Sequence, residues 1–354
     1  MIDLDARTTY ERLDPQRMGD RIADMGNQIR QARRLAAAFP HPGSEYRQAR
    51  NIVVLGMGGS AIGADLVRSL ADDQITVPMV ASRDYRCPAF VGPESLVIAS
   101  SYSGNTEETL SAVQDALSRG ARVMALTTGG SLAMIAQRNG LPVLRFQYEA
   151  QPRAAMGFSF GLLLGVLSKL GYLDESRLGV EEALTAASSI PLFLGSESPA
   201  ESNPAKQMAL RLYGKLPVVY GSGILSEVAR RWKGQFNENA KAWAFFEQLP
   251  ELNHNAVVGY ENPAELGAGV HVLLLSSSHY HPRVAARIRV TADILRDRGV
   301  SHEVVEARGR GAMAQMLDAV MTGDYVTYYL ALLYESDPTP VRAIDFLKQE
   351  LAGT

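Results

Sequence analysis

The chain has little cysteine and almost no charge bias, and its first residues do not resemble a secretion-type leader. Cys87 is the only cysteine in 354 residues, so an internal disulfide is excluded. The 35 basic and 38 acidic residues leave a net charge of -3, which argues against nucleic acid or an anionic membrane surface as a partner. The first residues contain neither a basic region nor an apolar one. We therefore expect a cytoplasmic protein whose partners are small molecules.

Long hydrophobic runs are also missing. The most apolar stretch, Met156 to Leu170, includes two serines and a lysine and is too short to span a bilayer comfortably. We expect it to be a buried helix. Hydrophobic residues make up 46% of the chain, which is enough to fill the cores of two domains.

Two turns rich in glycine and hydroxyl groups each follow a short apolar run. One is Gly56-Met57-Gly58-Gly59-Ser60, and the other is Ser101-Tyr102-Ser103-Gly104-Asn105-Thr106. Each turn opens a helical pattern, so backbone N–H groups at the helix start can face an anion. Glycine lets the backbone come close, and the hydroxyls add neutral donors for the oxygens of a phosphate monoester. The residues predicted to bind phosphate are Gly58, Gly59, Ser60, Ser101, Ser103 and Thr106.

The first turn alone also fits a loose dinucleotide-binding pattern. Gly56, Gly58 and Ala61 have that spacing, and Asp84 follows at about the distance of a ribose-binding acid. The second turn matches nothing that a nicotinamide cofactor needs. The two turns together resemble the SIS (sugar isomerase) domain, whose sugar-phosphate site combines them.

Strand and helix patterns alternate along the chain, which predicts doubly wound parallel sheets. We expect a leading helix from Asp14 to about Ala38, and two α/β subdomains of the flavodoxin-like SIS type. The predicted division is a leading helical segment at 1–50, a first SIS domain with the phosphate site at 51–153, a helical connection at 154–215, a second SIS domain at 216–335 and a C-terminal helix at 336–354.

The second domain reads as a degenerate copy of the first. Val218 to Gly223 repeats the pattern of Val53 to Gly58, and Leu273 to Ser277 repeats that of Val97 to Ser101. The copy then has Ser278-His279-Tyr280-His281-Pro282 and lacks the glycine and threonine of the second turn. We expect one phosphate site per chain, although chance similarity between two strand–turn–helix units also explains the match.

Several later motifs narrow the resemblance. Pro152-Arg153-Ala154-Ala155, Asn237-Glu238-Asn239, Asn253-His254-Asn255 and Lys348 follow the two turns in order. Over nearly the whole chain, the set resembles the bifunctional phosphoglucose/phosphomannose isomerase family of archaea and some bacteria. The resemblance implies an enzyme of carbohydrate metabolism that interconverts glucose 6-phosphate and mannose 6-phosphate with fructose 6-phosphate through a cis-enediolate.

The resemblance also implies roles for four residues. Glu238 is similar to the family's base, with neighbouring amides expected to hold its carboxylate, and Arg153 to the arginine near the enediolate oxygen. His254 and Lys348 are similar to the ring-opening pair. The histidine would come from a neighbouring subunit, which implies a homodimer with shared active sites. No cofactor or metal is implied, and Thr339 is a candidate for the wall near the base.

Other interpretations stay open from the residues alone. Each of the four residues has a purely structural alternative, such as a helix-start arginine or a solvated terminal lysine. His279 and His281 have the spacing of metal ligands, but no cysteine or acidic cluster accompanies them. A sugar-phosphate sensor, an aminosugar-phosphate isomerase and a nucleotide-dependent dehydrogenase are the alternative functions.

Overall fold

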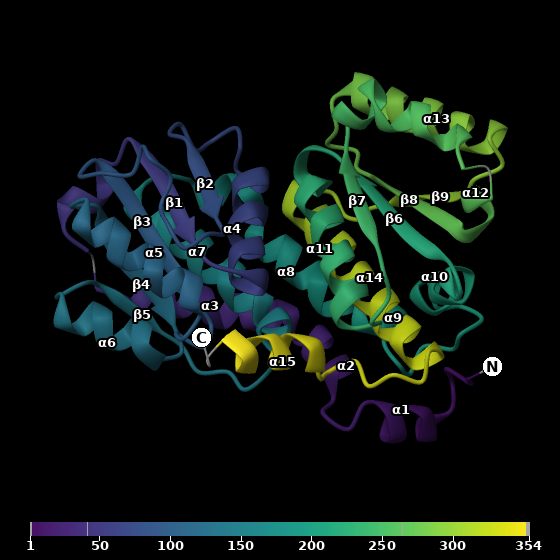
Figure 1. The fold of residues 1–354 in the computed structure, drawn as a ribbon, viewed down its shortest axis with the longest axis horizontal. Helices are drawn as coiled ribbons and strands as arrows, with labels where there is room; N and C mark the ends of the chain where they lie inside the picture. The colour runs from purple at the N-terminus through teal and green to yellow at the C-terminus, as the bar shows by residue number, and fades with distance from the viewer. Residues whose placement is uncertain (1, 41, 264, 352–354) are drawn as a thin grey trace.

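The computed structural model describes residues 2–40, 42–263 and 265–351, in two α/β domains that lie side by side (Figure 1). Met1 of the predicted leading segment and residues 352–354 of the predicted C-terminal segment lie outside the described residues. Each domain is built on one parallel sheet, as the sequence predicts.

Sheet A forms the first domain, with strand order β2-β1-β3-β4-β5 and parallel pairing throughout. Its central strand β3 is buried along its whole length, which is why it reads as a continuous apolar run in the sequence. The strands are β1 (Asn51–Leu55), β2 (Met79–Ser82), β3 (Ser95–Ser101), β4 (Arg122–Thr127) and β5 (Val143–Arg145). The connecting helices are α4 (Gly58–Leu70), α5 (Glu107–Ser118) and α6 (Gly130–Arg138).

The core helix of the first domain is α7 (Met156–Leu170), which matches the predicted buried helix. It packs against α4 and against α3 (Met25–Ala38). Three glycines four residues apart, Gly157, Gly161 and Gly165, lie on the α7 face that touches α3. A Cβ at these positions would meet Gln28, Ala32 and Ala36 at 2.7, 2.8 and 2.6 Å respectively. The two helices can therefore approach closely only because these residues have no side chain.

One helical segment in the described part of the chain, Pro152–Leu170, is long and apolar enough to cross a membrane by length and composition alone. Its most apolar window is 78% buried inside the protein, where it contacts α3 and α4. Its hydrophobic surface is therefore already covered by the first domain.

The leading region differs from the single helix predicted from Asp14. It contains α1 (Arg7–Leu13) and α2 (Met18–Ala23), and α3 begins only after Asp24. Asp14 lies in a turn, where its carboxylate accepts hydrogen bonds from the backbone N–H groups of Met18 and Gly19 at 2.7 and 3.0 Å. A residue that caps the following helix in this way interrupts the expected one.

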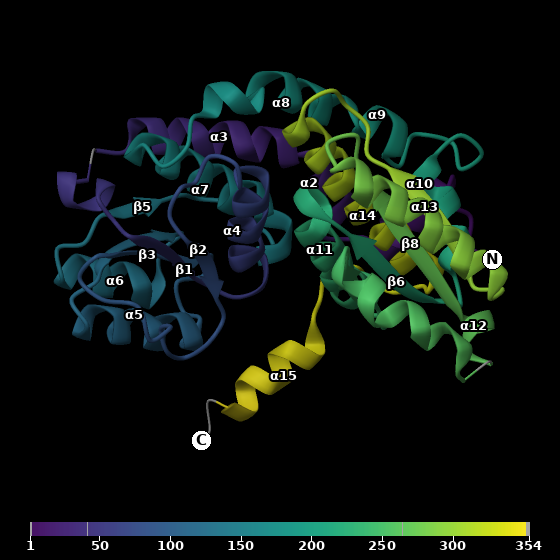
Figure 2. The same ribbon diagram turned by 90° about the horizontal axis from the view of Figure 1, so that it is seen from above.

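A helical connection joins the domains, and its helices α7 and α9 end at Gly171 and Gly195. Helix α8 lies at the upper edge of Figure 2, where it packs against α3 of the first domain and α14 of the second. The elements are η2 (Pro152–Ala155), η3 (Glu175–Leu178), α8 (Val180–Ser189), α9 (Pro191–Leu194) and α10 (Pro204–Leu212), and η1 (Ser44–Arg47) precedes sheet A.

Sheet B forms the second domain, with strand order β7-β6-β8-β9 and parallel pairing throughout. Its order matches the first four strands of sheet A, which agrees with the predicted repeat. The strands are β6 (Leu216–Gly221), β7 (Phe245–Gln248), β8 (Val270–Ser276) and β9 (Ser301–Glu306). The helices are η4 (Gly223–Leu225), α11 (Ser226–Glu238), η5 (Glu251–His254), η6 (Ala256–Glu261), α12 (Leu266–Gly269) and α13 (Pro282–Asp297).

The core helix of the second domain is α14 (Ala312–Leu333), in which all but the first residue are buried. Gly323 in its middle leaves room for the ring of Trp232 on α11, whose indole N–H donates to the Ala319 carbonyl at 2.8 Å. Helix α15 (Arg342–Leu351) has no buried residue and stands out from both domains (Figure 2).

Candidate functional site

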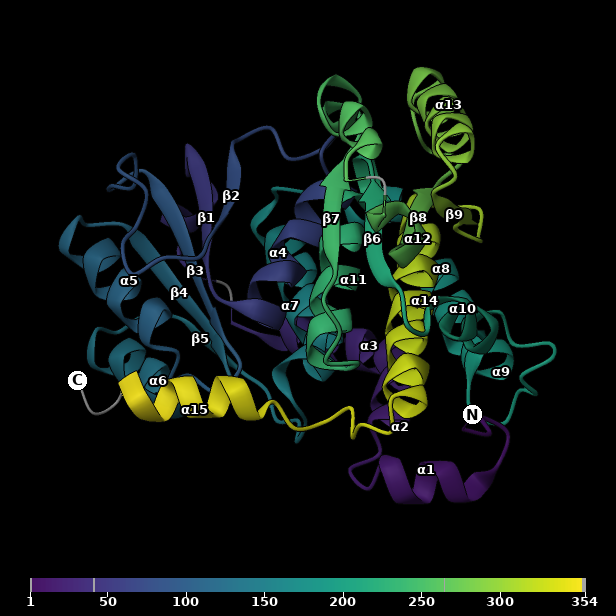
Figure 3. The same ribbon diagram turned by 45° about the vertical axis from the view of Figure 1, so that its right-hand side comes forward.

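A cleft of about 310 Å³ lies between the two domains, where α4 and α11 run side by side (Figure 3). The N-terminal turn of α4 lines one wall with Gly58 and Gly59, and α11 lines the other, ending at Glu238. Arg153, from η2 at the start of the α7 segment, completes the lining. The cleft therefore joins the first predicted turn to two of the residues predicted to carry chemistry.

Basic side chains dominate this cleft, and Glu238 is the one acidic residue among the described residues that line it. The basic residues are Arg83, Arg153, Arg230, Arg231 and Lys233. All four arginines have carboxylate partners, which are Asp65 for Arg83, Glu238 for Arg153, Glu227 for Arg230 and Asp324 for Arg231. Among the residues that line the cleft, basic side chains still outnumber acidic ones, which favours an anionic ligand.

The first turn brings the backbone close to Arg153. Gly58 has a φ of +48°, which lies in the left-handed region that suits glycine. A Cβ on Gly59 would lie 2.7 Å from the Pro152 carbonyl oxygen, one residue before Arg153. Glycine at position 59 therefore lets the start of α4 touch the segment that carries the arginine.

The second turn lies next to the first at the carboxyl edge of sheet A. The backbone N–H of Tyr102 donates to the Ser60 hydroxyl at 3.3 Å, which links the two turns. Within the second turn, the Ser101 and Thr106 hydroxyls are 3.0 Å apart, and the Gly104 N–H donates to Ser101 at 3.1 Å. The structure thus brings the predicted hydroxyl groups together, and Ser103 is exposed to solvent.

Arg153 holds three parts of the chain together. Its guanidinium group donates to the Asn239 side chain at 2.8 Å and to the carbonyls of Pro338 and Thr339 at 2.6 and 2.8 Å. Its Nη1 lies 3.4 Å from Oε2 of Glu238. Burial lowers the pKa of Arg153, but an arginine starts so high that it stays charged at neutral pH. A fixed positive charge therefore lies next to the predicted base.

Glu238 is the last residue of α11, and about a third of its side chain is exposed, on the side of the cleft. The expectation that neighbouring amides hold its carboxylate is wrong. Asn237 donates instead to the Ala242 carbonyl at 2.8 Å, and Asn239 to the Thr327 hydroxyl at 3.1 Å. These bonds fix the end of α11 and leave the carboxylate with Arg153.

A buried ion pair contacts the backbone of Arg153 and helps to hold it in place. Arg231 donates to Asp324 of α14 at 2.6 Å and to the Arg153 carbonyl at 3.3 Å. Gln235 donates to the same aspartate at 2.9 Å. Burial raises the pKa of Asp324, and the bonds from Arg231 oppose that shift. Sequence reasoning missed this network because its partners lie about ninety residues apart and no local pattern marks them.

The structure does not bring His254 or Lys348 to the cleft within one chain. His254 ends η5 and is exposed, and its neighbour Asn253 is tied to Thr291 of α13 at 2.9 Å. Lys348 is exposed on α15, which stands apart from both domains. Thr339 lies behind Arg153 with its side chain buried.

The corresponding turn of sheet B is filled by its own side chains. The Tyr280 hydroxyl accepts from the Ser222 N–H and donates to the Leu275 carbonyl, at 3.3 and 3.2 Å. Gln315 of α14 accepts from the Ser277 hydroxyl at 2.6 Å. Both side chains are at least nine-tenths buried, so no space remains there for an anion.

The two histidines with metal-ligand spacing have structural partners instead. His279 contacts the Arg310 carbonyl through Nε2 at 2.9 Å. His281 caps α13, because its Nδ1 accepts from the Arg283 N–H at 3.2 Å. Within the described residues, no group of three potential metal ligands is found.

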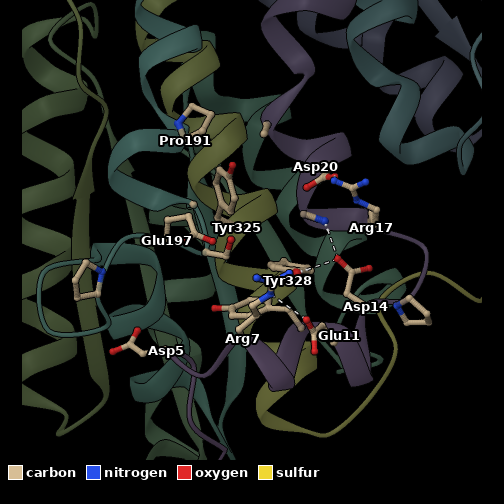
Figure 4. A pocket seen from close by; sticks show the side chains of 17 residues that line it. Asp5, Arg7, Glu11, Asp14, Arg17, Asp20, Pro191, Glu197, Tyr325 and Tyr328 are labelled. Carbon is tan, nitrogen blue, oxygen red and sulfur yellow. Dashed lines mark hydrogen bonds and ion pairs between the residues drawn. The ribbon is translucent and has the colours of Figure 1, made fainter.

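A larger cavity of about 1060 Å³ is lined by α1, α2, α14 and the loop after α9 (Figure 4). Most of its charged side chains are matched with one another. Glu11 pairs with Arg7, Asp20 with Arg17, and Asp5 with Lys206, while Asp14 accepts from Tyr328 and two backbone N–H groups. None of the predicted site residues is among the described residues that line this cavity.

Comparisons with known proteins find matching families for both parts of the chain. Residues 45–139 match the SIS domain, and residues 201–351 match the bacterial phospho-glucose isomerase C-terminal SIS domain. The chain is 43% identical over 302 residues to a bifunctional phosphoglucose/phosphomannose isomerase of Caldicellulosiruptor bescii, covering 85% of this chain and 89% of that protein. It is 36% identical over 307 residues to a protein of the same name from Aquifex aeolicus, covering 85% and 90%.

The fold is also that of a solved structure. A hypothetical protein of Thermus thermophilus superimposes with a TM-score of 0.74 at 18% identity, covering 98% of this chain and 92% of that one. At this identity, the likeness supports the arrangement of the two domains alone.

Proposed function

This chain belongs to the family of bifunctional phosphoglucose/phosphomannose isomerases, and we propose that it interconverts glucose 6-phosphate and mannose 6-phosphate with fructose 6-phosphate in the cleft between its domains. It is an isomerase with an SIS domain. The specific reaction, its mechanism and the residues that perform it are our proposal.

One observation carries the proposal: the carboxylate of Glu238 lies 3.4 Å from the guanidinium of Arg153, in a basic cleft that begins at the glycine turn of α4. An aldose–ketose isomerase needs a base beside C1 and C2 and a fixed positive charge beside the oxygen that becomes negative. The phosphate would lie against the turns that contain Ser60, Ser101 and Thr106.

The proposed reaction moves two protons: one passes from C2 to C1, and the other passes from the hydroxyl on C2 to the oxygen on C1. Glu238 takes the proton from C2 of the open-chain aldose, and the electron pair forms the C1–C2 double bond of a cis-enediolate. Arg153 stabilises the negative charge on oxygen. Return of a proton to C1 gives the ketose, and return to either face of C2 gives the glucose or the mannose configuration.

Ring opening is assigned to His254 and Lys348, neither of which lines the cleft of its own chain. We therefore propose a homodimer in which His254 serves the cleft of the neighbouring subunit. The exposed aromatic side chains of Trp243 and Phe245, at 80% and 51% exposure, lie between Glu238 and His254 in the chain and offer apolar surface for that contact. Lys348 can act only if α15 moves toward a cleft or reaches that of the partner.

Subunit complementation tests the shared site. Glu238→Gln and His254→Ala, each inactive alone, would be mixed under conditions that exchange subunits. Random exchange makes half of the dimers hybrids with one intact site each, so recovered activity should approach about one quarter of the parent's. No recovery after proven exchange would place both residues of a site on one chain.

A coupled assay tests the function itself. The purified protein would be supplied with glucose 6-phosphate or mannose 6-phosphate, and fructose 6-phosphate would be measured in the presence of EDTA. Turnover of both without added nucleotide supports the proposal. Turnover of glucosamine 6-phosphate alone would favour the aminosugar-phosphate isomerase, binding without turnover the sensor, and activity only with a nicotinamide nucleotide the dehydrogenase.

The division of the chain at residues 50, 153, 215 and 335 is part of the same proposal. A cytoplasmic location is supported by the single cysteine of the sequence, which fits a reducing compartment.

A further inference from the structure

Lys241 lies behind the proposed base and is used by none of the steps above. Its ammonium group donates to four backbone carbonyls from two separate segments. Two are the carbonyls of Glu238 and Asn239 at the end of α11, at 2.9 and 3.2 Å. The other two are those of Asp337 and Pro338, between α14 and α15, at 2.8 and 3.1 Å. One side chain therefore ties together two segments almost a hundred residues apart.

Both of these segments also determine where Arg153 lies. The Pro338 carbonyl accepts from Lys241 and also from Nη2 of Arg153 at 2.6 Å. The Asn239 side chain accepts from Nε of Arg153 at 2.8 Å, while the Asn239 backbone carbonyl accepts from Lys241. If the two segments separate, Arg153 cannot keep its bonds to both of them.

The backbone conformation of Lys241 is a second observation in favour of a specific role for its side chain. Its φ is +54°, in the left-handed region that a residue with a Cβ adopts at some cost. Glycine would adopt this conformation freely just after a helix. The four carbonyl contacts explain how the surrounding structure holds a lysine there.

We propose that Lys241 is a positioning residue for the isomerase reaction, whose ammonium group fixes the carboxylate of Glu238 at the correct distance from Arg153 by joining the end of α11 to segment 337–338. The proposal rests on the proposed function. Lys241 does not touch the substrate, and it acts through the placement of the two residues that do.

The charge state of Lys241 gives this role a pH dependence. Burial, together with the nearby charge of Arg153, lowers the pKa of Lys241 to about 8, while Asp337 and Glu238 act in the opposite direction. The ammonium form is therefore present below about pH 8. Above that pH the neutral amine has one donor fewer and no charge, so its hold on four carbonyls weakens.

The test compares Lys241→Met, Lys241→Arg and a matched control. Lys169→Met is the control, because Lys169 also uses its ammonium group to bind carbonyls at a helix end, those of Ala36 and Ala37 in α3, at 3.4 and 2.8 Å. It lies in the first domain and does not line the cleft. Turnover and KM for fructose 6-phosphate would be measured from pH 6 to 10.

We expect Lys241→Met to lower kcat by about 10- to 100-fold at pH 7 with KM nearly unchanged, because misplacing a base by a fraction of an ångström slows the chemical step more than it weakens binding. The parent should lose kcat above about pH 8, and Lys241→Arg should keep most of its kcat and lack this limb, because arginine does not titrate there. Lys169→Met should match the parent in both respects.

A second measurement does not depend on activity. Backbone hydrogen exchange of peptides covering residues 334–341 should be faster at pH 7 in Lys241→Met than in the parent or in Lys169→Met. A parent without isomerase activity would refute the proposed function, and the exchange result would still decide whether Lys241 joins the two segments. Unchanged exchange, or a Lys241→Met enzyme with unchanged kcat and an alkaline limb like the parent's, would overturn the proposal.

Discussion

At the carboxyl edges of the two sheets, the backbone turns are similar, but the side chains that fill these turns differ. After β1 and β6, Gly58 and Gly223 adopt nearly the same left-handed φ, +48° and +45°. Beyond the next strand, sheet A has the exposed side chain of Ser103, whereas sheet B has the buried side chains of Tyr280 and Gln315 in the corresponding turn. The repeated fold supplies the turns, but the side chains decide whether a ligand can use them.

The two domains also have different proposed roles, one in binding the phosphate and the other in supplying the base. The proposed phosphate contacts come from the first domain alone, while the proposed base comes from α11 of the second. Arg153 lies between them and touches both, since η2 meets α4 on one side and Glu238 on the other. The second domain therefore contributes to the site through the side of its sheet that faces the first domain, away from its own filled turn.

The largest effect should come from the proposed base. Glu238→Gln keeps the size of the side chain and removes its ability to accept a proton, so kcat should fall by a factor on the order of a hundred or more while substrate binding persists. Steady-state kinetics with fructose 6-phosphate would measure this. Glu247→Gln, on the exposed edge strand β7, is the matched control. If both variants kept turnover within a few-fold of the parent, Glu238 would not be the base.

Next in size is the effect of the hydroxyl groups that distinguish the two turns. Ser101→Ala and Thr106→Ala should each raise KM by about 10- to 100-fold and change kcat less, because a hydrogen bond to a charged group contributes about 1.5 to 3 kcal/mol. The matched variant in the second domain, Ser277→Ala, should leave KM unchanged, because Ser277 bonds to Gln315. An equal rise in KM for Ser277→Ala would show that the second turn also takes part in binding.

A smaller effect is expected from the side chain that fills the second turn. Tyr280→Phe leaves the buried Ser222 N–H without its partner, and the free energy of unfolding should fall by about 1 kcal/mol with kcat and KM unchanged. Chemical denaturation and kinetics on the same preparation would measure both. Phosphate-dependent stabilisation that appears only in this variant would mean that Tyr280 covers a usable anion site.

The smallest effect concerns acid stability at sheet B. Burial raises the pKa of Glu303, but hydrogen bonds from His271 and Arg211 outweigh it and leave the pKa below its usual range. A carboxyl whose folded-state pKa is lowered stabilises the protein above its unfolded pKa and loses that contribution as the pH falls through the folded value. Glu303→Gln should therefore weaken the acid dependence of unfolding between about pH 5 and 3 and leave KM unchanged at pH 7. An unaltered acid dependence would show that this contact adds nothing to stability.

The sequence predicted most of sheet A because its strands are buried on both faces. The apolar runs at Ile52 and Leu96 carry that signal, and the turns after them mark the site. Strands β7 and β9 lie at the edges of sheet B and contain no fully buried residue, so the sequence marks them less clearly than the strands of sheet A. The leading helix was misplaced because Asp14 reads as a helix start but sits one turn before it.

The sequence predicted those site residues that belong to a motif of a few consecutive residues. Arg153 and Glu238 come together as the family resemblance implies, although their separation in the chain gives no hint of the 3.4 Å contact. Lys241 and Asp324 could not be found, because their roles depend on carbonyls and side chains brought together only by the fold. The proposed roles of His254 and Lys348 depend on a neighbouring subunit or on a movement of α15, and the sequence of one chain specifies neither.

The most direct test of the central claim follows the proton at C2. Fructose 6-phosphate would be incubated with the protein in D₂O containing EDTA, and the products would be analysed by NMR. The account predicts glucose 6-phosphate and mannose 6-phosphate with deuterium at C2, formed by the parent and not by Glu238→Gln. A folded parent that forms neither aldose phosphate, or a Glu238→Gln variant that labels C2 as fast as the parent, would contradict it.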